Sequence, residues 1–352
     1  MKKVLLILSV VAILLICVFS GCSKSEPVPA AVSIDPARLQ GFGALPQVMA
    51  AATNPITEEK VALGRMLYYE TRLSKSQKLS CNSCHMLNKY GVDGESTSDG
   101  HNGQKGDRNS PTVYNAAGHV AQFWDGRAAD VEAQAKGPVL NPVEMAMPSE
   151  KHVVEVLKSM PEYVETFKKA FPEEKDPLNY DNMAKAIGAF ERRLVTPSRW
   201  DKFLGGDPNA LTDAEKVGFN TFVELGCQTC HAGAYVGGSR FEKIGAAKPW
   251  PDNADPGREK VTKSEADRMV FKVPSLRNID QTGPYFHNGK TATLDQAVSA
   301  MAEYQLGKTL TDAQLKSITS WLKSLTGDIP ADYIKEPALP KSTAKTPKPD
   351  LS

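Results

Sequence analysis

The pentapeptide Cys-x-x-Cys-His occurs twice in this chain of 352 residues, as Cys81–His85 and as Cys227–His231. It is the attachment signature of c-type haem, in which two cysteines form thioether bonds to the porphyrin and the histidine coordinates the iron from one face. Two copies in a chain with only six cysteines predict a dihaem protein. The core of the fold must therefore include two porphyrins, and the question becomes what lies on the open face of each iron.

The N-terminus has the pattern of a targeting segment. A basic start and an apolar run over residues 4–19 precede Ser20-Gly21-Cys22, which predicts a signal peptide over residues 1–21. The small-small-Cys ending resembles a lipoprotein cleavage site with Cys22 as the lipidated residue. Phe19 stands where an aliphatic residue is usual, so ordinary signal cleavage stays open. An uncleaved anchor is disfavoured because the run is short for a span of about 20 residues.

Charge and cysteine usage narrow the classes of partner. Lysine and arginine number 42 against 41 acidic residues, and removing the two lysines of residues 1–21 leaves 40 against 41. A near-neutral chain argues against a nucleic-acid partner. The haem motifs use all four cysteines beyond Cys22, so no disulfide is expected. Haem attachment of this type implies export across the inner membrane, and we expect a periplasmic location.

The length leaves room for about two domains. Composition predicts a tether over residues 22–45, an N-terminal haem domain over 46–200 and a C-terminal haem domain over 201–333. The Pro/Lys-rich residues 334–352 have little to bury. We expect them to form a mobile tail or a strap on the surface.

A weak internal repeat supports two similar domains. Residues 56–60 and 211–216 each lead an expected helix toward a haem motif, and Thr212 with Glu215 has the pattern of a capping box. Apolar residues at helical spacing predict closing helices over 183–194 and 315–325, the second behind a cap at Thr311 and Gln314. The predicted fold class is mostly α, with two cytochrome c-like haem domains packed against each other.

The residues alone leave the sixth iron ligands open. His152 is at a surface helix start, His119 is in a turn without a clear role, and His287 is in a tight loop that could face a haem edge. His101 is in a Gly-rich loop sixteen residues after His85, which could fold back over the porphyrin. Met301 follows the second motif, although a helical methionine is usually core filler.

Several further motifs give the chain a specific resemblance. Over roughly residues 45 to 330 it resembles the bacterial dihaem cytochrome c peroxidases. The segments that carry the resemblance, in order, are Cys81–His85 with Gly91–Gly94, Gly106–Thr112, Gln122–Ala128, Gly137–Met145, and Val273–Asn278 running into the Met301 region.

The resemblance implies unequal roles for two covalently bound haems c. The N-terminal haem, attached at Cys81 and Cys84 and ligated by His85, would be peroxidatic, with His101 as a removable sixth ligand. The C-terminal haem, attached at Cys227 and Cys230 and ligated by His231 and Met301, would accept electrons. Reduction of the C-terminal haem would then release His101, and the glycines around it suit a mobile loop.

The resemblance also implies the catalytic groups. Glu144 would transfer a proton between the oxygens of peroxide, in an apolar setting that raises its pKa. Gln134 would orient peroxide, and Trp124 would lie on the electron route between the haems, although a tryptophan in this motif is more often core. One calcium ion would be held by Asn109, Thr282 and Pro284, through oxygen ligands that suit it.

The expected function is reduction of hydrogen peroxide to water with electrons from a small periplasmic c-type cytochrome, and a homodimer is implied. The alternative is a dihaem electron relay with little peroxidase activity. A relative that oxidises protein side chains to build a quinone cofactor would have Tyr at the position of Met301, and Tyr304 lies only one turn away. Two zinc or redox Cys-x-x-Cys sites are disfavoured by the histidine after each second cysteine.

Overall fold

The structure is a computed structural model that describes residues 32–352. The predicted signal peptide and the candidate lipidation site Cys22 lie outside the described residues. The described residues form many helices and one short antiparallel strand pair, β1 (Phe241–Lys243) and β2 (Val270–Lys272). The predicted mostly helical class is confirmed. The α-helices are α1 (Glu58–Tyr69), α2 (Cys81–Cys84), α3 (Val131–Leu140), α4 (Glu150–Lys158), α5 (Pro161–Ala170), α6 (Tyr180–Glu191), α7 (Arg199–Leu204), α8 (Asp213–Leu225), α9 (Glu259–Thr262), α10 (Leu294–Ala300) and α11 (Asp312–Lys323).

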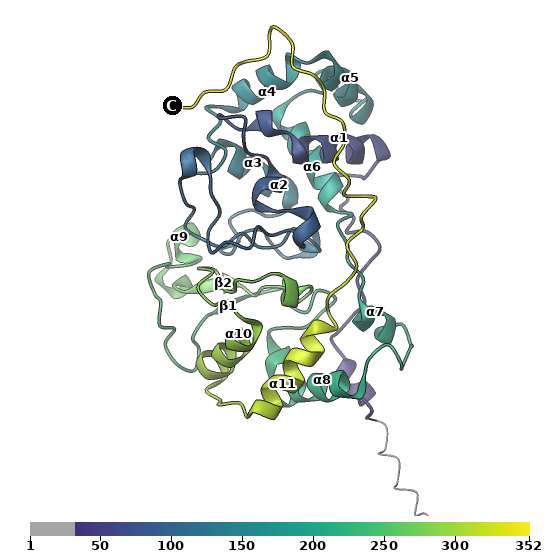
Figure 1. Cartoon of the computed structure of the whole chain (residues 1–352), viewed down its shortest axis with the longest axis vertical. Helices are drawn as coiled ribbons and strands as arrows, with labels where there is room; N and C mark the ends of the chain where they lie inside the picture. The colour runs from purple at the N-terminus through teal and green to yellow at the C-terminus, as the bar shows by residue number, and fades with distance from the viewer. Residues whose placement is uncertain (1–31) are drawn as a thin grey trace, which may run out of the picture. The chain divides into compact units, whose positions relative to one another are not determined.

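Each half of the described chain is built around a crossed pair of helices. α1 packs on α6, and α8 packs on α11, and Figure 1 shows the two pairs well separated from each other. The predicted opening and closing helices are therefore present in both halves. The predicted caps of α8 and α11 are also confirmed, since the Thr212 and Thr311 side chains accept from the main-chain N–H groups of Glu215 and Gln314.

Glycine sets the distance between the helices of each pair. A Cβ atom on Gly64 of α1 would lie 1.9 Å from the carbonyl oxygen of Ala186, and one on Gly218 of α8 would lie 1.9 Å from that of Ser317. No side chain fits at such a distance, so the two backbones can meet only where a glycine stands. The same close approach in both halves supports the sequence repeat.

The buried hydrophobic residues form two clusters. The first cluster includes Leu63, Leu67 and Phe190. All its members except Ile334 lie at or before Leu194 in the sequence. All members of the second cluster except Ile34 lie at or after Trp200 in the sequence. In this cluster the aromatic rings of Trp200, Phe219 and Trp321, which come from three helices, pack against one another. The change from one cluster to the other between Leu194 and Trp200 supports the predicted haem domains, 46–200 and 201–333, which stay a prediction.

A buried hydrogen-bonded group joins the two halves at this point. The hydroxyl of Thr196 accepts from the side-chain amides of Asn115 and of Asn278, both at 2.9 Å. Asn115 also accepts from the Thr196 backbone N–H at 3.1 Å, and Asn278 accepts from the Gly327 N–H at 3.0 Å. All three side chains are fully buried. Because a buried polar atom without a hydrogen-bond partner is costly, these hydrogen bonds favour one arrangement of the two halves.

The described part of the predicted tether, residues 32–45, is packed against the second cluster. Ile34 belongs to that cluster, Phe42 lies edge-on to Trp200 with ring centroids 5.9 Å apart, and the Leu45 N–H donates to Asp201 at 2.8 Å. The apolar side chains of this segment are therefore packed against the second cluster. The Pro/Ala/Ser composition of the segment does not predict this packing.

Residues 335–352, called the strap from here on, lie in extended form along the first half, and Figure 1 shows them as the yellow trace beside α1 and α5. Side chains of the body hold the main chain of the strap at several points. Arg72 donates to the carbonyl oxygen of Pro340 at 2.8 Å and Gln77 to that of Pro347 at 2.8 Å. Thr343 in turn donates to the carbonyl oxygen of Ser159 at 2.9 Å. Of the predicted segment 334–352, Ile334 belongs to the first hydrophobic cluster and the other residues lie as a strap on the surface.

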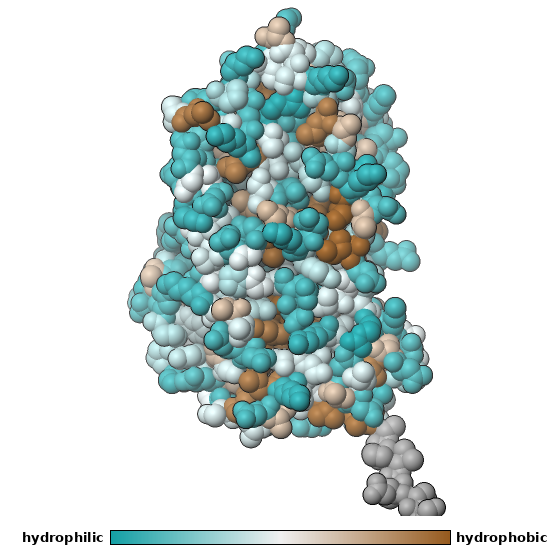
Figure 2. Space-filling view, viewed as in Figure 1, coloured by the Kyte–Doolittle hydropathy of each residue, from teal (hydrophilic) through white to brown (hydrophobic). Residues whose placement is uncertain are grey.

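The surface shown in Figure 2 is mostly hydrophilic, with separate small hydrophobic areas. The large apolar side chains that are exposed among the described residues are scattered along the sequence, at Val48, Val120, Val217, Val261 and Leu351. None of the helices in residues 32–352 combines the length and the apolar composition needed to span a membrane.

Replacing Gly218 by alanine tests the close contact of α8 and α11. The added methyl group would meet the carbonyl of Ser317, so we expect the helices to move apart and the protein to lose about 2 kcal/mol of stability. The measurement is the urea midpoint of the haem-loaded protein. The control is Gly137→Ala in α3, where the nearest atom is 3.5 Å away and no loss is expected. Equal midpoints for the two variants would contradict the argument.

Candidate functional site

The first haem motif begins at the N-terminus of α2, with Cys81 and Cys84 at the two ends of that single turn and His85 directly after it. Nδ1 of His85 lies 3.0 Å from the carbonyl oxygen of Pro111. Because a carbonyl only accepts, Nδ1 carries the hydrogen and Nε2 keeps the lone pair that an iron needs. Burial lowers the pKa of His85, which also favours the neutral, ligating form.

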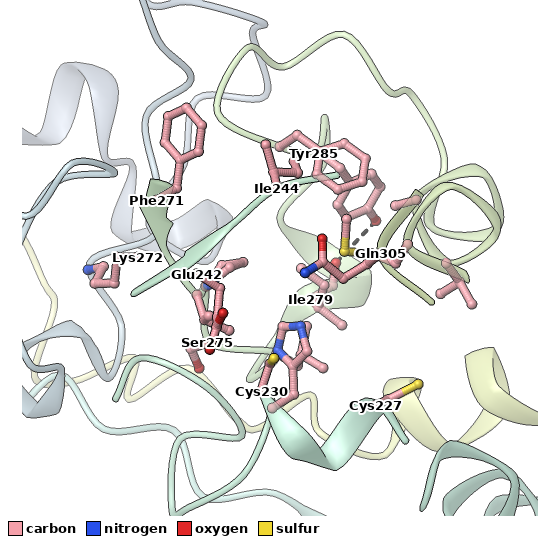
Figure 3. A pocket seen from close by; sticks show the side chains of 18 of the residues that line it. Cys227, Cys230, Glu242, Ile244, Phe271, Lys272, Ser275, Ile279, Tyr285 and Gln305 are labelled. Atoms are coloured by element: carbon pink, nitrogen blue, oxygen red, sulfur yellow. Dashed lines mark hydrogen bonds between the residues drawn. The ribbon is translucent and has the colours of Figure 1, made fainter. Parts of the chain in front are cut away.

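The second motif lines an apolar cavity of about 450 Å³. Cys227, Cys230 and His231 form part of its wall together with Met301. In Figure 3 the two cysteines lie on one side of the cavity, and Ile244, Tyr285 and Gln305 lie on another. Burial lowers the pKa of His231 to about 4, against a smaller opposing effect of the neighbouring backbone, so this imidazole too is neutral.

These two sets of residues fit covalent haem. Each has two free cysteine thiols beside a neutral histidine, and burial raises the pKa values of Cys84 and Cys227 to about 11. The thiols are therefore protonated near neutral pH and are the groups that can add to the vinyl substituents of a porphyrin. The apolar lining of the cavity that contains His231 suits a porphyrin, and Met301 lines the same cavity.

A second repeat, missed in the sequence, positions the residues after each motif. Segments 111–128 and 274–291 contain matching residues at identical spacing. Both have a left-handed asparagine, Asn115 (φ 62°) and Asn278 (φ 61°), and both then form a turn closed by a bridge, Gln122 to Ala128 and Tyr285 to Thr291. Within the turns, Phe123 and Phe286 have φ values of 65° and 66°. The signal that could have found the repeat is the shared order Pro, Asn, Phe, Gly.

The repeat shows which candidates occupy equivalent positions. Trp124 of the first turn corresponds to His287 of the second, and their ring centroids lie 6.4 Å apart in an edge-on arrangement. Gln134, the fourth residue of α3, corresponds to Ala297 of α10. Met301 begins a π-helical turn, Met301–Gln305, that continues α10. Such turns re-aim side chains and are frequent at functional sites.

The loop that carries His101 is docked on the turn that carries Glu144. The His101 N–H donates to the carbonyl oxygens of Glu144 at 2.8 Å and of Val143 at 3.2 Å. A Cβ atom on Gly100 would lie 1.8 Å from the Val143 oxygen, so this glycine is required for the contact. The structure therefore brings His101 and Glu144 together, and His101 is only 4% exposed.

Glu144 has the environment of a proton-transfer group. Burial raises its pKa, while Arg127 and a hydrogen bond from the Asn141 amide, at 2.8 Å, oppose the rise. Glu144 in turn helps to raise the pKa of the Cys84 thiol, which places its carboxyl group near the first haem motif. Gln134 is half-buried in α3, and its side-chain amide makes no hydrogen bond within residues 32–352.

Trp124 lies between the two halves. Its indole N–H donates to the carbonyl oxygen of Asn109 at 2.9 Å, and its own carbonyl oxygen accepts from the Lys272 N–H at 2.8 Å. Asn109 lines the same cavity as Thr282 and Pro284, so the three predicted calcium positions share one region. No group of three or more His, Cys, Asp or Glu side chains suited to a metal is found in the described part of the chain.

Two charged groups near Trp124, the partly buried Arg108 and the buried Lys272, were not anticipated. Arg108 pairs with Asp125 at 2.6 Å and with Asp255 at 2.6 Å, so it joins a turn of the first half to the second half. The ammonium group of Lys272 donates to the carbonyl oxygen of Ala121 at 2.8 Å. Figure 3 shows that it turns away from the cavity. Burial lowers the pKa of Lys272 to about 8. The sequence around Arg108 and Lys272 does not indicate that either residue contacts the other half of the chain.

The remaining histidines have structural surroundings. His119 is partly buried beside Lys272 and lies edge-on to Tyr235, with ring centroids 5.5 Å apart. His152 lies 3.6 Å from Glu155 on the surface of α4, where it was expected. His287 is 2% exposed, is stacked on Phe271 at 4.2 Å and lines the cavity.

Comparison with known proteins identifies the family. A family model for di-haem cytochrome c peroxidase matches residues 58–209. The chain is 49% identical to the cytochrome c551 peroxidase of Nitrosomonas europaea over 300 residues, which are 84% of this chain and 88% of that one. It is 45% identical to the cytochrome c551 peroxidase of Pseudomonas aeruginosa, over 86% of this chain and 88% of that one. The chain belongs to the di-haem cytochrome c peroxidase family.

A solved structure agrees with this assignment. The crystal structure of a MauG-like protein associated with microbial copper homeostasis superposes with a TM-score of 0.74 at 28% identity, over 83% of this chain and 97% of that one. The predicted resemblance is therefore confirmed, and so is the predicted pair of haem-binding units within one mostly helical fold.

Proposed function

We propose that the protein reduces hydrogen peroxide to water, H2O2 + 2 e− + 2 H+ → 2 H2O, with electrons from a small c-type cytochrome. Membership of the family supports the activity. The observation that carries the assignment of roles is the unequal surroundings of the two motifs. The first has Glu144 and the docked His101 loop nearby, and the second shares a cavity with Met301.

Two covalently bound haems c would supply the redox chemistry by taking and giving single electrons. Cys81, Cys84, Cys227 and Cys230 would hold them, and His85 and His231 would be their proximal ligands. Met301 is the proposed sixth ligand in the second unit, where a thioether favours a higher reduction potential than a second imidazole does. His101 is the proposed sixth ligand in the first unit, where its removal would admit peroxide.

The chain's own groups would handle peroxide and its protons. Glu144 as carboxylate would take the proton of one peroxide oxygen and give it to the other oxygen, which leaves as water. Gln134, with its unused amide, would orient peroxide through a hydrogen bond. Trp124 would provide the contact between the two units, because it is bonded to both Asn109 and Lys272.

We also propose one calcium ion bound by Asn109, Thr282 and Pro284. The three residues line one cavity, and the Asn109 amide N–H donates to the Glu95 carbonyl at 2.9 Å, which leaves its side-chain oxygen free to coordinate. Metal analysis of the purified protein should find one calcium per chain, and Asn109→Ala should lose it while the exposed control Asn209→Ala keeps it. Protein that neither contains calcium nor takes it up in a titration would contradict the site.

The proposed setting is the periplasm, after cleavage of residues 1–21, with lipidation of Cys22 anchoring the protein to a membrane. A homodimer is the proposed assembly. Mass spectrometry of the exported protein would find or exclude a diacylglycerol on Cys22, and light scattering would give the mass of the particle.

The acidic limb of the pH–rate profile should belong to Glu144. Burial raises its pKa, and only the carboxylate can accept a proton, so activity should fall as the pH drops through that raised value. Glu144→Gln should lose this limb and about 10²- to 10⁴-fold of kcat. The control is the exposed Glu162→Gln, which should keep both. If Glu144→Gln retained the rate and the limb, Glu144 would not be the proton-transfer group.

The gating role of His101 can be tested together with the function. Addition of one electron equivalent to the oxidised protein should produce a high-spin N-terminal haem and rapid peroxide turnover. His101→Gly should be active without prior reduction, and His152→Gln should behave as the parent protein does. An unchanged lag in His101→Gly would remove His101 from gating. Negligible turnover by the reduced parent protein would overturn the peroxidase and favour an electron relay.

A further inference from the structure

The end of the strap reaches the ring of His101. Nε2 of His101 lies 3.0 Å from the carbonyl oxygen of Ser352, and the side-chain amide of the adjacent Asn102 donates to the carbonyl oxygen of Leu351 at 3.2 Å. The strap thus follows the first half from Pro340 to its last residues and makes its final contacts with the loop that carries the proposed iron ligand.

Residues of the body hold this end of the strap in place. The ammonium group of Lys75 donates to the carbonyl oxygen of Ser352 at 2.8 Å and to its hydroxyl at 2.9 Å, and it lies 3.4 Å from the Asp350 carboxylate. The Asp350 N–H donates to the carbonyl oxygen of Lys75 at 2.9 Å. The Lys75 N–H donates to Met145 at 2.8 Å. Lys75 therefore joins the strap to the turn that carries Glu144.

The contact decides which nitrogen of His101 is available. The main-chain oxygen of Ser352 only accepts, so Nε2 carries a hydrogen while it is bonded to Ser352. A histidine nitrogen must be deprotonated to coordinate a metal. Nε2 can therefore bind either the strap or an iron, but not both at once. Nδ1 of His101 is buried and has no hydrogen-bond partner within residues 32–352.

We propose that residues 350–352 act as a latch that competes with the N-terminal haem iron for Nε2 of His101 and so favours the open, peroxide-accessible state. The proposal rests on the proposed role of His101 as the removable sixth ligand. Residues 350–352 and Lys75 are positioning groups, since they act on the reaction only through His101. The docked loop, held on Val143 and Glu144, is then the open state of the first unit.

Weakening the latch should close the site. Lys75→Met removes the ammonium group that holds Ser352 and Asp350, and deletion of residues 350–352 removes the acceptor itself. In the haem-loaded protein after addition of one electron equivalent, each change should lower the ratio of high-spin to low-spin N-terminal haem about fivefold, the effect of losing one hydrogen bond. Cyanide, used as a probe of the open iron, should bind more slowly by a similar factor.

Two controls separate the latch from general effects on the strap. Lys348→Met removes the same charge at an exposed strap position whose side chain makes no hydrogen bond in the described structure, and it should leave the spin state unchanged. Lys75→Arg keeps a donor near Ser352 and should restore much of the high-spin fraction. A thermal midpoint measured for each variant would reveal a loss of folding, which the latch does not require.

A double variant distinguishes failure of the latch from failure of the proposed gating. In His101→Gly, deletion of residues 350–352 should have no further effect on the spin state. If His101→Gly leaves the spin state of the fully oxidised protein unchanged, the proposed role of His101 fails. If His101→Gly opens the site but the deletion in the parent chain changes nothing, the latch fails. An increase in high-spin haem after the deletion would also overturn it, because the strap would then orient His101 for coordination through Nδ1.

Discussion

The buried contact of Asn115, Thr196 and Asn278 fixes the relation between the two halves of the described chain. Each asparagine has left-handed backbone geometry and lies four residues after a proline, Pro111 in one case and Pro274 in the other. Pro111 supplies the carbonyl that orients His85, and Pro274 lines the cavity of His231. The hydroxyl of Thr196 therefore fixes the relative position of the segments that begin at Pro111 and Pro274. Because all the polar groups of this contact have hydrogen-bond partners, only one relative position is favoured.

Much of this organisation could be predicted from the sequence. The haem motifs, the helical class and the caps at Thr212 and Thr311 follow from local chemistry and periodicity, which act over a few residues. The contact between halves could not, because it depends on single side chains such as Thr196 that meet only after folding. The packing of residues 32–45 and of the strap was missed or left open for the same reason, since composition does not show which surface will receive a segment.

Some features of the candidate site could likewise be predicted from the sequence, and others could not. The nearness of His101 to Glu144 is visible only in the structure, because it depends on a main-chain contact that Gly100 permits. The raised pKa of Glu144 was expected from its apolar neighbours, and burial is indeed its cause. The contact of the strap with His101 had no sequence signal, since the acceptor is a main-chain oxygen and not a side chain.

The paired turns have a consequence for how the two halves came to differ. Between Pro111 and α3, and between Pro274 and α10, the backbone has the same left-handed asparagine and the same bridged turn at the same spacing. Many of the differences there are substitutions, as with Trp124 and His287. The segment from His85 to Pro111 does not match the segment from His231 to Pro274. In the first half it contains the His101 loop, and in the second it contains β1, α9 and β2. The two halves therefore differ most in one variable segment between two matched points, and the loop of the proposed ligand His101 lies in that segment.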